Sequence, residues 1–258
     1  MMSLSTDRIL TRNTIATGFD FQADLATQTS HFSIYYATSL SASDGNKYAQ
    51  YVAQQCEKDY TQLQSFFANV TIPDNSLPFN ILVGPNIPGA YHHGCSDTDL
   101  YCDAVDDPEE LNMLVVAEEV EVFEAVQGKG WDCGATNGEA LSRALAEELH
   151  TTQNAGFLIA PAWINSRRRD YISTNESTDQ DTFANACGLL FLNWLHTKLA
   201  YSWTDIVQQG APTLGQTYAA LTGKPASQAF TDFLAAINQL FPAGTTADVT
   251  TNNPFRQA

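Results

Sequence analysis

Four glutamates lie within seven positions of one helical segment, at Glu118, Glu119, Glu121 and Glu124. The segment that contains them, VVAEEVEVFEAVQ (115–127), repeats apolar residues at the spacing of a buried helix. At 100° per residue Glu118 and Glu121 share one face, whereas Glu119 falls among the valines of the opposite face. Carboxylates about 5–6 Å apart repel by roughly 3 kcal/mol at an effective dielectric near 20. An enclosed face would therefore need raised pKa values, a bound cation or an arginine.

A second segment with chemical potential is NGEALSR (137–143), which carries Glu139 and, one helical turn later, Arg143. Together with AEEVE (117–121) it resembles the central motifs of the gluzincin metallopeptidases, the thermolysin-like scaffold. That family carries HExxH on one helix and a third zinc-binding glutamate about twenty residues later on the next helix. The order of the expected strands and helices resembles the family over residues 31–240.

The resemblance assigns a role to each position of the two segments. Ala117 stands where the family has its first zinc-binding histidine, and Glu121 where it has the second. Glu118 matches the general-base glutamate, and Glu139 the third zinc ligand. Arg143 replaces the aspartate that orients the first histidine in thermolysin-like members.

These replacements change the cofactor that we expect. Zinc sites favour imidazole nitrogen, and two carboxylates without an imidazole suit a harder cation such as calcium. We therefore expect no zinc cofactor, with Glu121 and Glu139 as the remaining candidate ligands of a hard cation. An arginine in place of the orienting aspartate can neutralise Glu118, Glu121 and Glu139 through charged hydrogen bonds. The sequence thus favours a metal site converted into an ion-pair cluster.

Three functions follow from these residues. The first is a metallopeptidase-like protein, a pseudoenzyme that has lost zinc-dependent peptidase activity and keeps its cleft for a peptide or protein ligand or for structure. The second is an active hydrolase with Glu118 as catalytic general base, assisted by a non-zinc cation or by carboxylates alone. The third is an α+β interaction protein whose resemblance to the family is coincidental.

Other residues offer weaker chemistry. His92 and His93 could join Cys95 in binding a metal, but adjacent residues point apart on a strand, which favours a loop without a metal. Glu147 and His150 copy half of a carboxylate-bridged di-iron motif, which needs a second Glu-x-x-His and further glutamates. The chain has no second Glu-x-x-His, so we expect this pair to be structural.

The five cysteines form no Cys-x-x-Cys pair, which excludes a zinc-ribbon signature. Cys95 and Cys102 bracket six residues and would close a short disulfide loop in an oxidising compartment. Buried free thiols are the alternative.

The composition of the chain limits the classes of partner that it can bind. The formal net charge of −17 argues against nucleic acid, because phosphate binding needs clustered lysine and arginine. No apolar stretch approaches the roughly 20 residues of a membrane span. The start, MMSLSTDRIL, lacks the apolar core of a signal peptide, so we expect a cytosolic protein or a secreted mature form whose signal has been removed.

The elements that must position these residues are strands first and helices later. We expect a loose arm over the first 25 residues or so, strands at 31–40 and 77–86, and a long amphipathic helix at 46–70 between them. Residues 90–110 should form a short strand and an acidic loop. Helices follow at 109–127, 139–150 and 182–201, and three more come before the irregular tail: 203–210, 213–223 and 227–241.

This order predicts an α+β fold. A mixed sheet lobe with helices, residues 1–127, ends in the central AEEVE helix. That helix joins it to an all-helical lobe, residues 128–258, in one compact unit.

Overall fold

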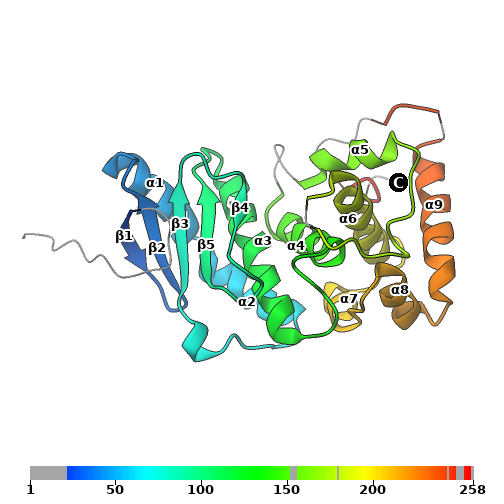
Figure 1. The fold of residues 1–258 in the computed structure, drawn as a ribbon, viewed down its shortest axis with the longest axis horizontal. Coiled ribbons are helices and arrows are strands. Elements are labelled where there is room, and N and C mark those ends of the chain that lie inside the picture. The colour runs from blue at the N-terminus through cyan, green and yellow to red at the C-terminus, as the bar shows by residue number, and fades with distance from the viewer. Residues whose placement is uncertain (1–21, 152–155, 179, 243, 248–252, 257–258) are drawn as a thin grey trace, which may run out of the picture.

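The computed structural model describes residues 22–151, 156–178, 180–242, 244–247 and 253–256. Within them the chain forms a five-stranded mixed sheet followed by a helical lobe (Figure 1). The α+β class expected from the sequence is confirmed. The earliest part of the expected N-terminal arm, residues 1–21, lies outside the described residues.

The sheet has the strand order β1-β2-β3-β5-β4. The central strands β2, β3 and β5 are parallel, and the edge strands β1 and β4 each pair antiparallel to their neighbour. The bounds are Ala23–Gln28, Phe32–Ala37, Phe79–Gly84, Ala90–Tyr91 and Asp99–Asp103 for β1 to β5. Every residue of β2 is buried, as its run of β-branched and aromatic residues predicts.

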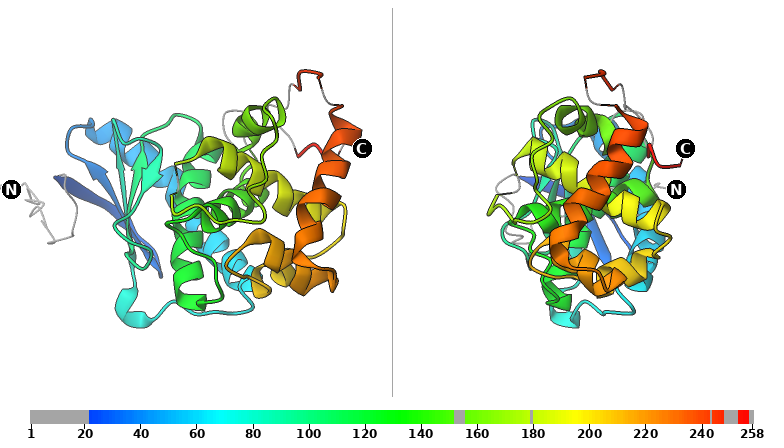
Figure 2. Two further views of the ribbon diagram at one scale, coloured as in Figure 1. Left: turned by 45° about the vertical axis from the view of Figure 1, so that its right-hand side comes forward. Right: turned by 90° about the vertical axis from the view of Figure 1, so that its right-hand side faces the viewer.

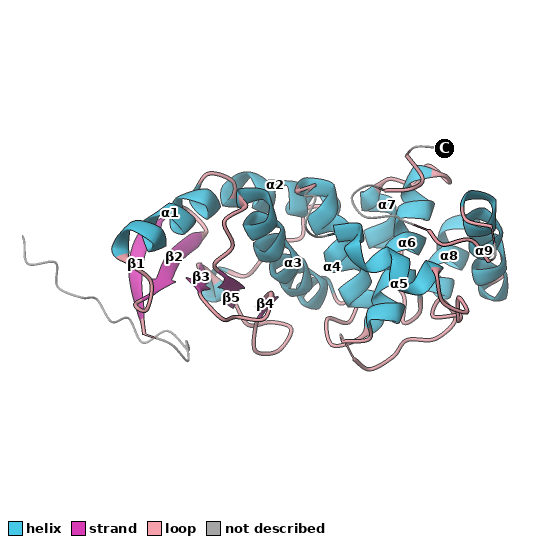
Figure 3. Ribbon diagram, turned by 90° about the horizontal axis from the view of Figure 1, so that it is seen from above, coloured by secondary structure: helices cyan, strands magenta, loops and turns pink. Residues whose placement is uncertain are grey.

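Three expectations for this lobe are wrong. The last residues of the expected loose arm form strand β1, which pairs with β2 at one edge of the sheet. The expected long helix is two helices, α1 (Ala42–Ala53) and α2 (Cys56–Phe66), because the chain leaves the helical path at Gln55. Figure 3 shows α1 and α2 along one side of the sheet. The expected acidic loop after β4 also contains a strand, β5, which pairs with β3 and β4.

Helix α3 (Pro108–Gln127) is the central helix, as predicted. Asp107 caps its first turn, and Pro108 occupies a position where a missing N–H has no cost. Gly128 ends the helix in the left-handed conformation, with φ of 63°. Helix α4 (Thr136–Leu149) then packs against α3 (Figure 1).

The close approach of these two helices depends on Gly138. A Cβ atom there would lie 2.2 Å from the Asp132 carbonyl oxygen and 2.6 Å from a carboxyl oxygen of Glu124. Only glycine leaves room for that contact.

The second half of the chain is helical, as predicted (Figure 2). It contains α6 (Thr182–Thr197), α7 (Trp203–Gln208), α8 (Leu214–Thr222) and α9 (Ala229–Leu240). The short helix α5 (Ala160–Ile164), which follows a 3₁₀ turn at Gly156–Ile159, was not expected from the turn-rich sequence around it. Further 3₁₀ turns lie at Asp74–Ser76 and Ala226–Gln228.

One hydrophobic cluster runs from the sheet through α3 and α4 into the helical lobe, so α3 lies in a shared core. Among the described residues, no helix combines the length and the apolar character needed to cross a membrane.

Candidate functional site

A cleft of about 860 Å³ opens where the edge of the sheet meets α3 and α4. Its walls are strand β4 with the loop after it, one face of each helix, and the start of α6. The volume falls in the range of roughly 300–1,000 Å³ that is usual for ligand sites. All five residues that the sequence singles out line this cleft: Ala117, Glu118, Glu121, Glu139 and Arg143.

Glu118 is held by a histidine. The carboxylate of Glu118 accepts a hydrogen bond from Nδ1 of His92, at 2.7 Å. The other ring nitrogen, Nε2, lies 3.8 Å from a carboxyl oxygen of Glu121. The side chain of His92 is only 2% exposed. An imidazole therefore does lie beside the two glutamates, although α3 itself contains no histidine.

The structure gives His92 a partner that the sequence did not suggest. His92 directly follows β4, and it points into the cleft while its neighbour His93 is exposed and packs against Tyr91 and Tyr101. The expectation that the two rings point apart holds, but one of them points at the glutamates. The sequence signal for this was a pair of histidines at the end of an expected strand.

Glu121 has an unusual charge state. Burial, followed by the nearby acidic groups of Glu118, Glu124 and Glu139, raises its pKa to about 11. A hydrogen bond to Glu139 acts in the same direction. The raised pKa favours the protonated form of Glu121, which is hydrogen-bonded with Glu139.

Arg143 pairs with one carboxylate and not with three. Its Nε donates to Oε1 of Glu139 at 2.5 Å, and its Nη2 reaches the same oxygen. The two residues are one helical turn apart on α4, and the arginine side chain is 40% exposed. The hypothesis that Arg143 also neutralises Glu118 is replaced by the His92 pairing, because the guanidinium follows its own helix instead of crossing to α3.

The remaining two of the four glutamates between positions 118 and 124 lie in the core. Glu119 and Glu124 are fully buried, and neither carboxyl has a hydrogen-bond partner among the described residues. Burial, with a contribution from neighbouring acids, raises the pKa of both well above the usual value. Both are therefore neutral in the folded protein, which removes the repulsion that the sequence implies.

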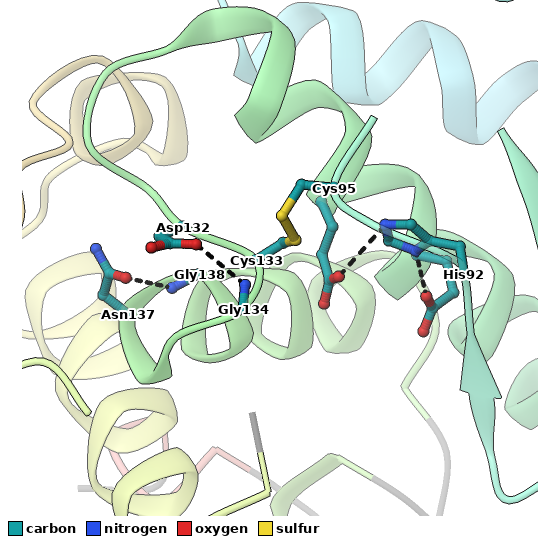
Figure 4. The surroundings of a disulfide bond; sticks show 9 residues. His92, Cys95, Asp132, Cys133, Gly134, Asn137 and Gly138 are labelled. Atoms are coloured by element: carbon teal, nitrogen blue, oxygen red, sulfur yellow. Dashed lines mark hydrogen bonds and ion pairs between the residues drawn. A yellow bond between two sulfur atoms is a disulfide. The ribbon is translucent and has the colours of Figure 1, made fainter. Parts of the chain in front are cut away.

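A disulfide forms one wall of the site. It joins Cys95 to Cys133, 38 residues apart, and not to Cys102, which is buried in β5 with a free thiol. The bond connects the loop after β4 to the loop between α3 and α4 (Figure 4). The expectation of a short loop closed by Cys95 and Cys102 is therefore wrong, since Cys102 points into the sheet core.

The sulfur of Cys133 lies close to the histidine and one glutamate. A ring nitrogen of His92, a carboxyl oxygen of Glu121 and Sγ of Cys133 are all within 4.8 Å of one another. A sulfur in a disulfide carries no negative charge and is not a thiolate ligand. In the oxidised protein this group therefore offers one imidazole and one carboxyl only.

His150 belongs to a separate, structural centre. Its Nε2 lies 2.8 Å from Asp59 and its Nδ1 2.9 Å from Glu109, so both ring nitrogens are paired. Burial alone would lower the pKa of His150, but the hydrogen bonds to the two acids raise it. The hydrogen-bond partners of His150 are these two acids and do not include Glu147, whose pKa burial raises to about 7.

The cleft therefore combines an imidazole held by one glutamate, a protonated glutamate, an ion pair and a disulfide. When the chain is compared with models of protein families and with curated proteins, neither comparison yields a match.

Proposed function

We propose that the chain is a metallopeptidase-like protein that binds an extended peptide in its cleft and does not cleave it by the zinc chemistry of the gluzincins. The position of β4 carries the proposal. This strand is at the edge of the sheet and lines the same cleft as Glu118 and Glu121. A strand at a sheet edge has one side without a neighbouring strand, and an extended peptide can pair with it.

The state of the glutamates argues against the family's chemistry. Ala117 offers a methyl group where the first histidine ligand would stand, and Glu121 offers a protonated carboxyl in place of the second. Glu118 accepts a hydrogen bond from His92, so the carboxylate that would activate a water is already engaged. Binding without hydrolysis is the function that this arrangement supports best.

The charge of the protein favours one class of peptide. A net charge of −17 attracts cationic ligands and repels acidic ones over distances of about a Debye length. We therefore expect the bound peptides to be rich in lysine or arginine, and their affinity to fall as salt is raised.

A pair of variants on one helix tests the proposal. Ala117→Phe fills the floor of the cleft without removing a polar group, and Ala125→Phe adds the same ring at an exposed position of α3 outside it. Selection from a displayed random decapeptide library should yield cationic peptides with the wild type and with Ala125→Phe. With Ala117→Phe we expect at least tenfold weaker binding of the selected peptides.

Two further measurements complete the test. Amide hydrogen exchange should slow at residues 89–92 when a selected peptide is bound, because strand pairing protects backbone amides. Mass spectrometry of the incubated peptides should show no cleavage. Hydrolysis that is lost in Glu118→Gln would instead support the hydrolase hypothesis, and equal binding by both phenylalanine variants would place the peptide elsewhere.

A further inference from the structure

The corner of the cleft next to the disulfide brings three metal-binding side chains together. A ring nitrogen of His92, a carboxyl oxygen of Glu121 and Sγ of Cys133 lie within 4.8 Å of one another. They come from the loop after β4, from α3 and from the loop between α3 and α4. Figure 4 shows the sulfurs beside the His92 ring. The bond to Cys95 is what keeps the third side chain from acting as a ligand.

We propose that reduction of the Cys95–Cys133 disulfide converts this corner into a zinc site formed by His92, Glu121 and Cys133. The redox state of the disulfide then controls zinc binding, because the oxidised protein lacks the thiolate and the reduced protein supplies it. This site goes beyond the peptide-binding function proposed above and does not depend on it.

The three donors match zinc in chemistry and in spacing. Zinc takes imidazole nitrogen, thiolate sulfur and carboxylate oxygen, and three protein ligands leave a fourth position for water. Ligand atoms on one tetrahedral zinc lie roughly 3.3–3.8 Å apart. Nε2 of His92 and the nearest oxygen of Glu121 are already 3.8 Å apart, so only a small approach of the sulfur is needed. The carboxylate pair considered from the sequence, Glu121 and Glu139, had neither nitrogen nor sulfur.

The histidine is already oriented for a ligand role. Its Nδ1 donates to Glu118, which directs Nε2 toward Glu121. Metal-binding histidines commonly donate their second nitrogen to a carboxylate in this way. The carboxyl of Glu121 also lies near the acidic groups of Glu118 and Glu139, whose negative charge favours a divalent cation at this place.

A dithiol reductant supplies the electrons and protons that this conversion needs. The dithiol gives two electrons and two protons to the S–S bond, which breaks into two thiols, and the dithiol becomes a disulfide itself. Zinc then displaces two protons to solvent, one from the Cys133 thiol and one from the Glu121 carboxyl, and a zinc–sulfur and a zinc–oxygen bond form. Cys95 is released as a free thiol and is not one of the three ligands.

Two single substitutions distinguish loss of the disulfide from loss of the proposed ligand Cys133. Cys95→Ser and Cys133→Ser break the same disulfide, but only Cys95→Ser leaves the Cys133 thiol in place. Zinc affinity is measured by competition with a chromophoric chelator, without reductant. We expect Cys95→Ser to bind one zinc per chain at least tenfold more tightly than Cys133→Ser or the oxidised wild type. Cobalt added to Cys95→Ser should give a thiolate-to-metal absorption band that Cys133→Ser lacks.

Ligand variants in the Cys95→Ser background identify the other two donors. His92→Ala and Glu121→Gln should each weaken zinc binding at least tenfold. Cys56, Cys102 and Cys187 are buried thiols common to all these variants, so they act as an internal control. Circular dichroism and urea midpoints of the two serine variants should agree when zinc is absent, because both have lost the same bond.

Two results would overturn the proposal: equal zinc affinity of the two serine variants, or zinc binding by the oxidised wild type as tight as by the reduced one. If the serine variants unfold, the wild type reduced with a phosphine is compared with reduced His92→Ala. These two proteins keep every cysteine. Equal affinity there would reject the site as well.

Discussion

Two histidines of this protein each lie between two acidic side chains, yet they serve different purposes. His150 is hydrogen-bonded through both nitrogens, to Asp59 and Glu109, and it is enclosed. His92 is hydrogen-bonded through Nδ1 to Glu118, while Nε2 is 3.8 Å from Glu121, beyond hydrogen-bond distance. A histidine between two acids is therefore fully hydrogen-bonded at position 150, where its role is structural. At position 92 the same arrangement leaves Nε2 beyond hydrogen-bond distance of Glu121, so this nitrogen can bind a ligand.

The largest effect expected from this contrast concerns stability. His150→Ala leaves Asp59, whose side chain is 4% exposed, buried without its partner. Loss of one member of a buried pair costs about 3–5 kcal/mol. His92→Ala removes a single hydrogen bond at the edge of a cleft and should cost about 0.5–1.5 kcal/mol. Urea unfolding of both variants measures the difference, and comparable losses would mean that His92 is structural too.

Substitution of Glu121 should change the stability of the protein by an intermediate amount. The folded pKa of about 11 lies far above the unfolded value near 4.5, so the stabilising contribution of the neutral carboxyl is complete below pH 4.5 and is lost progressively as the pH rises toward 11. Glu121→Gln keeps a neutral donor at every pH. We expect the variant to be more stable than the wild type at pH 8, with the two converging near pH 4.

Urea midpoints between pH 4 and pH 9 test this. Glu110→Gln, at a partly exposed position near the start of α3, is the matched control and should leave the pH profile unchanged. A wild-type profile parallel to that of Glu121→Gln would show that Glu121 is ionised in the folded protein.

The smallest expected effect is that of Arg143→Ala. The sequence-based hypothesis, in which Arg143 neutralises three buried carboxylates, implies a large loss of stability. In the structure the arginine is 40% exposed and pairs with Glu139 one turn away, and such pairs contribute about 0.3–0.5 kcal/mol. Thermal unfolding should therefore change by only a few degrees at most. A loss comparable to that of His150→Ala would restore the original hypothesis.

These contrasts also show what the sequence can predict. Periodicity and end signals suffice for α3, because its cap, its proline and its terminal glycine are local in the chain. They also place Glu118 and Glu121 on one face, since helical geometry is fixed. The same local patterns did not detect the break at Gln55, where no proline or glycine marks the end of α1.

The site itself depends on contacts between distant residues. His92 enters the cleft because β4 pairs with β5, and that pairing brings the loop after β4 over α3. Cys133 reaches Cys95 because the length of α3 and the reversal of the chain into α4 bring the loop between these helices to the loop after β4. The Cys95–Cys133 pairing has no sequence pattern, and the histidine pair does not show which of its rings faces α3, so both contacts required the three-dimensional structure.

The Cys95–Cys133 bond has a topological consequence. It closes the stretch of chain from residue 95 to residue 133 into a covalent ring that contains β5 and the whole of α3. A single cut of the backbone inside this ring leaves one connected molecule, whose two pieces separate only after reduction. The helix that carries all four glutamates is thus retained by the rest of the protein even when its own chain is severed.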